Sequence, residues 1–72
     1  MRLLILGTGR MAVNHAKAFQ TIAGVEMVGA VDTDPANLQS FADMFGIGQR
    51  FASFDAALAW GQFDAVDNVT PD

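Results

Sequence analysis

The segment LILGTGRMA, residues 4–12, constrains the fold of this chain more than any other. Residues 2–6 contain a continuous apolar run, which is typical of a parallel strand buried on both faces. Gly7 ends that run, and a helical pattern starts at Arg10. A buried strand that leads directly through a glycine turn into a helix predicts an α/β fold.

The remaining chain continues to alternate helix and strand signals with short connections. A helix is predicted over 10–23, because apolar residues recur at helical spacing and Gly24 follows as a C-terminal cap. A second helix starts at Pro35 after the N-cap Asp34 and stops at Gly46. A third follows the N-cap Ser53 and ends at Trp60. Further strands are predicted over 25–31, 50–52 and 63–70.

This alternation predicts a parallel sheet of about four strands in the order 3-2-1-4, with helices on both faces. The first two helices lie on one face, and the third crosses on the other. One short helix covers too little of that second face, so we expect a further partner there. Either the remainder of a longer polypeptide or a second copy of the chain can supply this cover.

Composition excludes several classes of partner. The chain has 72 residues, 51% hydrophobic and 17% charged, which indicates one globular domain without a membrane span. A net charge of −4 with scattered cations argues against nucleic acid. One His and no Cys provide no set of metal ligands. The lack of Cys, together with an apolar start too short for a signal peptide, predicts a cytoplasmic protein.

Residues 7–12 match the pattern G-x-G-x-x-G/A of dinucleotide-binding turns. Gly7 permits the tight turn, Gly9 lets the backbone approach a pyrophosphate, and Ala12 allows close packing of helix and strand. The amides of Arg10 and Met11 then point at the phosphates from the positive end of the helix dipole. The alternative is that the glycines serve only a tight strand-to-helix turn.

Asp32 follows the second predicted strand, where an acid is expected to accept hydrogen bonds from both hydroxyls of an adenosine ribose. Its alternative is an ordinary acid at a strand end. Asp34 is interpreted as the helix cap, but its charge adds to that of Asp32. Two carboxylates near a 2′-phosphate repel it by about 1–3 kcal/mol, so the sequence favours NAD over NADP.

The other polar residues support weaker predictions. His15 is interpreted as a packed or interface residue rather than a catalytic one, and Lys17 as solvated. Asp67 and Asn68 are either strand-end groups near a ligand or markers of an exposed edge. Three methionines are expected to line the core or a pocket: Met11, Met27 and Met44.

Taken together, the motifs GTGRMA, His15-Ala16, GVEMVGAVDTDP, FADMFGI and FDAVDNVTP resemble the Gfo/Idh/MocA family. The resemblance covers essentially the whole chain. It implies an amino-terminal NAD(P)-binding Rossmann domain followed by a mainly β domain that holds a sugar or polyol and drives oligomerisation. Residues 1–72 would then be the N-terminal part of that Rossmann domain, in an oxidoreductase that transfers hydride to or from a nicotinamide.

The resemblance also implies which residues bind the cofactor. The pyrophosphate is assigned to Gly7, Gly9, Arg10 and Met11, the adenosine ribose to Asp32, and the loop beside the cofactor to Thr70 and Pro71. Asn68 departs from the family pattern, which has an aliphatic residue there.

No catalytic residue is predicted within the 72 residues. The family's catalytic Lys, in a Glu-Lys-Pro stretch, and its downstream acid and His lie beyond Asp72, so we expect no turnover by these residues alone. One alternative is a non-catalytic, self-associating Rossmann half-domain. Another is a methyltransferase, whose turn has a third glycine where this chain has Met11.

Overall fold

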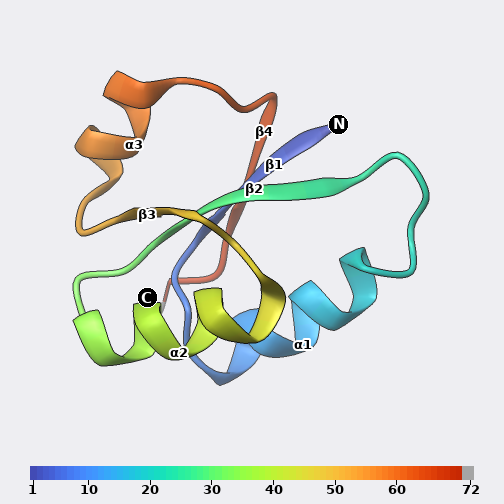
Figure 1. The fold of residues 1–72 in the computed structure, drawn as a ribbon, viewed down its shortest axis with the longest axis horizontal. Helices are drawn as coiled ribbons and strands as arrows, with labels where there is room; N and C mark the ends of the chain where they lie inside the picture. The colour runs from blue at the N-terminus through green and yellow to red at the C-terminus, as the bar shows by residue number, and fades with distance from the viewer. Residues whose placement is uncertain (71–72) are drawn as a thin grey trace.

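The computed structural model describes residues 1–70, which form a four-stranded parallel sheet flanked by helices on both faces (Figure 1). The sheet order is β3-β2-β1-β4, as predicted. The strands are β1 (Arg2–Leu6), β2 (Glu26–Val31), β3 (Gln49–Phe51) and β4 (Ala65–Asn68). The helices are α1 (Arg10–Phe19), α2 (Pro35–Phe45) and α3 (Phe54–Trp60).

Alternating side chains of β1 build a core on each face of the sheet. Leu3 and Ile5 are buried against α1 and α2, where the fully buried Ala12 allows α1 to approach the sheet closely. Leu4 faces the opposite way and packs with Ala57 of α3. Figure 1 accordingly shows α1 and α2 on one side of the sheet and α3 on the other.

Local capping chemistry determines both ends of α2 and α3, as predicted. The carboxylate of Asp34 accepts from two amides in the first turn of α2, at 3.0 and 3.1 Å. The hydroxyl of Ser53 accepts from the amide of Ala56 in α3 at 3.2 Å. Gly46 and Gly61 end these helices in the left-handed conformation, with φ of 67° and 66°.

The helix predicted over 10–23 was too long, because α1 ends at Phe19. The Thr21 hydroxyl and amide both donate to the carbonyl of Ala18, at 2.7 and 3.1 Å. That carbonyl is the acceptor that a further helical turn would use, so the chain leaves the helix in a tighter turn. Ala23 is exposed as a result, and Gly24 lies in the turn before β2.

The predicted strand boundaries differ by one or two residues from those observed. β2 starts one residue later than predicted, β3 is shifted by one residue toward the N-terminus, and β4 is shorter than the predicted 63–70. Phe63 stacks on Trp60, with ring centroids 6.2 Å apart, instead of extending the sheet. At the other end, the Asn68 side chain accepts from the amide and hydroxyl of Thr70 in a turn that closes β4.

One face of β4 has little cover within residues 1–70. Ala65 and Val69 pack toward α1 and α2, so Val66 faces the side of α3, where it is 38% exposed. Leu58 of α3 is also exposed. These apolar side chains agree with the predicted incomplete cover of this face. Separately, no helix in residues 1–70 has the length and apolar character needed to cross a membrane.

Candidate functional site

A groove of about 1020 Å³ lies where the carboxyl ends of β1, β2 and β4 meet the start of α1. Open parallel sheets bind ligands at the carboxyl ends of their strands, at the point where the strand order reverses, which in this sheet is β1. The lining includes six of the seven predicted cofactor-binding residues: Gly7, Gly9, Arg10, Met11, Asp32 and Thr70. The seventh, Pro71, lies outside the described residues.

Gly7 is required by the backbone itself. Its φ is +98°, a conformation that side chains strongly disfavour. A Cβ at this position would also stand 3.0 Å from the backbone of Val69 and Thr70. The Gly7 amide donates to the carbonyl of Val31 at 2.8 Å, which attaches the turn to the end of β2.

Gly9, in contrast, is not required by the fold. It is the N-cap of α1 with φ of −78°, which any residue adopts, and a Cβ at this position would have no heavy atom within 4 Å. The space above Gly9 opens into the groove. The first amides of a helix have no intrahelical acceptor, so this bare position fits the close approach of an anionic ligand.

Arg10 and Met11 form the wall beside this position. Arg10 is exposed, and its guanidinium makes no ion pair with a side chain in residues 1–70. Met11 is 64% exposed and presents an apolar surface to the groove. A cation, the positive helix end and an apolar wall therefore meet around Gly9.

Asp32 is held rigidly by neighbouring donors. Its Oδ2 accepts from the amide and hydroxyl of Thr8, at 2.9 and 2.6 Å, and its Oδ1 accepts from the amide of Asp34 at 2.9 Å. Burial raises the pKa of Asp32, but its hydrogen bonds, chiefly those from Thr8 and the Asp34 amide, outweigh this effect. The pKa therefore lies below its ordinary value of 3.8, and the carboxylate is charged at neutral pH.

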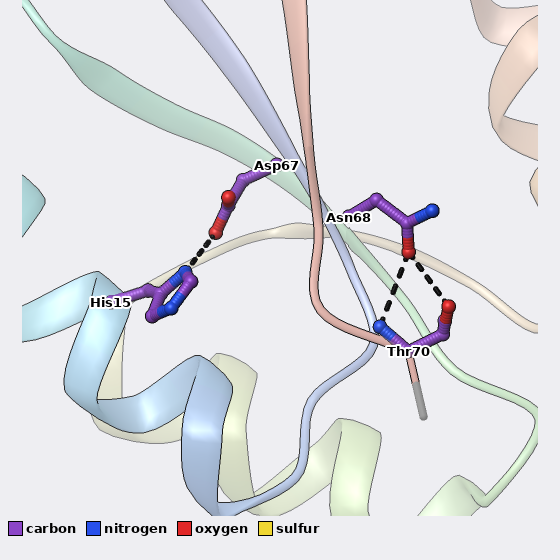
Figure 2. A network of polar contacts seen from close by, with 4 residues as sticks. All are labelled: His15, Asp67, Asn68 and Thr70. Atoms are coloured by element: carbon purple, nitrogen blue, oxygen red, sulfur yellow. Dashed lines mark hydrogen bonds and ion pairs between the residues drawn. The ribbon is translucent and has the colours of Figure 1, made fainter. Parts of the chain in front are cut away.

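Two polar contacts lie on opposite sides of β4 (Figure 2). His15 of α1 binds Asp67, with 2.7 Å between Nδ1 and Oδ2, and its ring also meets the edge of Phe19. Asn68 points to the other side, where its Oδ1 accepts from Thr70. His15, Asn68 and Thr70 line the groove, while Asp67 secures β4 to α1.

The structure adds site residues that sequence reasoning missed. Thr8, buried to 4% exposure, clamps Asp32, and nothing in the pattern Gly-x-Gly indicates that its middle side chain turns toward the second strand. Asn37 and Phe54 line the groove, and Ser53 lines it besides capping α3. Lys17 is exposed as predicted. Met44 is 57% exposed and lines a smaller pocket beside Gly9 and Arg10, which agrees with the pocket alternative of its prediction and not with a core position.

The arrangement suits one class of molecule. Backbone amides and Arg10 can hold an anionic group, while the charged Asp32 can accept from hydroxyls on the same ligand. Met11 and Phe54 offer apolar surface in the same groove. Within residues 1–70 no three His, Asp or Glu side chains cluster as ligands for a metal ion.

Comparison with known proteins agrees with this chemistry. The model of the Gfo/Idh/MocA family, described as an oxidoreductase family with an NAD-binding Rossmann fold, matches residues 1–72. A D-apiose dehydrogenase from Rhizobium rhizogenes is 36% identical over 66 residues, which make up 92% of this chain and 19% of the relative.

Solved structures are similar over nearly the whole chain. An oxidoreductase from Agrobacterium radiobacter, crystallised with NAD+, L-tartaric acid and magnesium, has a TM-score of 0.96 at 34% identity, covering 99% of this chain and 21% of that one. Scyllo-inositol dehydrogenase from Lactobacillus casei, with bound NAD(H) and scyllo-inositol, has a TM-score of 0.88 at 29% identity, with the same coverage.

The chain thus spans about a fifth of the length of these relatives. The family match extends over every residue, and it includes the glycine turn and Asp32, which the groove brings together. On these grounds, the chain belongs to the Gfo/Idh/MocA family of oxidoreductases with an NAD-binding Rossmann fold.

Proposed function

We propose that residues 1–72 are the N-terminal part of a dinucleotide-binding Rossmann domain. The protein would be an oxidoreductase that transfers hydride between a nicotinamide and a sugar, polyol or related substrate. The cofactor would supply the hydride acceptor, and the described residues would bind and orient it. The dehydrogenases of D-apiose and scyllo-inositol among the similar proteins support this substrate class.

The open space at Gly9 is the observation that carries the proposal. The fold demands a glycine at Gly7 but not at Gly9, so a ligand that rests on the backbone best explains the second glycine. In this arrangement the pyrophosphate lies against Gly7, Gly9, Arg10 and Met11. Asp32 then binds the adenosine ribose, and Thr70 with Pro71 forms the loop beside the cofactor.

We further propose that NAD is preferred over NADP. The carboxylates of Asp32 and Asp34 both lie at the start of α2, and the Asp34 amide donates to Asp32. A 2′-phosphate placed there would meet like charge, at a cost of about 1–3 kcal/mol. Titration with NADP+ should therefore give an affinity roughly 5- to 150-fold weaker than titration with NAD+.

Calorimetric titration of the chain with NADH tests the proposed binding site. We expect saturable binding that weakens in Arg10→Ala, because this substitution removes the cation beside the phosphate position. Lys17→Ala is the matched control, since Lys17 lies on the same helix, is exposed and does not line the groove. No binding by the wild type, or equal losses in both variants, would contradict the proposal.

A non-catalytic, self-associating half-domain is a second candidate, favoured by the exposure of Val66 on the edge strand β4 and of Leu58 on α3. Such surfaces are covered by a second copy or by further chain. Sedimentation of the purified 72-residue chain separates the two candidates. A dimer that does not bind NADH supports self-association, whereas a monomer that binds NADH supports the cofactor domain.

A further inference from the structure

The carboxylate of Asp32 has few acceptor positions left for a ligand. An ionised carboxylate offers about four, two on each oxygen. The amide and hydroxyl of Thr8 occupy both positions on Oδ2, and the Asp34 amide occupies one on Oδ1. At most one position therefore stays open, and it lies on Oδ1.

Thr8 cannot easily release Oδ2. It is the one buried polar residue within residues 1–70, and no other hydrogen bond of its hydroxyl is found there. Breaking the 2.6 Å bond to Asp32 would leave that hydroxyl buried without an acceptor. Gly7, whose amide is bonded to Val31, further restrains the backbone that carries Thr8.

We propose that Thr8 is a positioning residue that restricts Asp32 to a single ribose hydroxyl, accepted by Oδ1. This inference rests on the proposed dinucleotide site, and it differs from the two-hydroxyl contact expected from the sequence. Specificity for the ribose then depends on one of its two hydroxyls, because the other finds no acceptor on Asp32.

Two NAD analogues, lacking either the 2′- or the 3′-hydroxyl of the adenosine ribose, test this directly by calorimetry. In the wild type, one analogue should bind roughly tenfold or more weakly than NAD, and the other within about twofold. Asp32→Ala should remove the difference between the analogues. Comparable losses for both analogues in the wild type, or no loss for either, would overturn the proposal.

Thr8→Val preserves the shape of the side chain and removes its hydroxyl. The freed position on Oδ2 should then accept the second hydroxyl, so that both analogues bind more weakly than NAD. Thr8→Ser should restore the single-hydroxyl pattern. Thr21→Val is the matched control, since the Thr21 hydroxyl donates to Ala18 on the far end of α1. A Thr8→Val variant that retains the wild-type pattern would count against the positioning role.

A measurement without cofactor separates this inference from the proposed function. The side-chain carbon of Asp32 is followed by NMR during acid titration of the wild type, Thr8→Val and Thr8→Ser. Loss of the hydroxyl donor should raise the titration midpoint in Thr8→Val alone, and an unchanged midpoint would refute the clamp. Failure of the wild type to bind NADH would instead refute the dinucleotide site, whatever the titration shows.

Discussion

Gly7 and Gly9 allow a matched pair of substitutions to alanine, because the fold needs only one of the two glycines. At Gly7, a Cβ adds about 1–2 kcal/mol for the positive φ and about 1–3 kcal/mol for the clash with the Val69 backbone at 3.0 Å. A chain of 72 residues has a free energy of unfolding of roughly 4–11 kcal/mol. Gly7→Ala should therefore remove much of the stability.

At Gly9, the Cβ meets no neighbour and φ is unstrained. We expect Gly9→Ala to change the free energy of unfolding by less than about 1 kcal/mol, because a small loss of N-cap preference is offset by lower entropy of the unfolded chain. The same Cβ would displace the pyrophosphate from the helix amides. Loss of one such charge-assisted hydrogen bond weakens binding roughly 10- to 150-fold.

Urea denaturation measures the two stabilities, and calorimetric titration with NADH measures the two affinities. The expected result is a stable Gly9→Ala that binds poorly, beside a destabilised Gly7→Ala. If Gly9→Ala bound NADH as tightly as the wild type, the reasoning from open space to ligand would be refuted. If Gly9→Ala unfolded as readily as Gly7→Ala, the structural distinction between the two glycines would be wrong.

Three further experiments test other contacts. Asp34→Ala should lower the free energy of unfolding by about 0.5–2 kcal/mol and Ser53→Ala by less, because Asp34 caps two amides and Ser53 caps one; urea denaturation compares them. The pKa of Asp32 is lower in the folded than in the unfolded chain, so its stabilisation is present above pH ~3.8 and lost as the pH falls through the folded-state pKa. Asp32→Asn should therefore flatten the acid limb of stability against pH, and an unchanged limb would contradict this. A double-mutant cycle with His15→Ala and Asp67→Ala should give a coupling below about 1 kcal/mol, because the His15 side chain is 40% exposed; a coupling well above that value would show a stronger pair.

Much of the architecture could be predicted because its determinants are local in the sequence. Asp34 and Pro35 start α2 through a side-chain cap and a preset φ, and Gly46 ends it in the left-handed conformation. Successive side chains in the apolar run of β1 point to alternate faces of the sheet, so the run supplies both cores. The end of α1 escaped prediction because the Thr21 hydroxyl competes for a carbonyl that apolar periodicity does not register.

The candidate site likewise has residues that could be predicted from the sequence and contacts that could not. The motif predicted that Gly7, Gly9 and Asp32 would share a groove, since parallel strand ends meet at one edge. Contacts that depend on the rotation of α1 or on individual rotamers were not predictable. The bond of Thr8 to Asp32 is one example, and the bond of His15 to Asp67, residues that lie 52 apart in sequence, is another.

The amide of Gly7 donates to the carbonyl of Val31, the last residue of β2, and this bond restrains the glycine turn that forms the floor of the groove. The turn cannot move away from β2 without breaking this backbone hydrogen bond of 2.8 Å. In hydrogen–deuterium exchange, the Gly7 amide should therefore exchange only when the whole sheet opens. A ligand that arrives at this floor would find it already assembled, and would spend little free energy on ordering it.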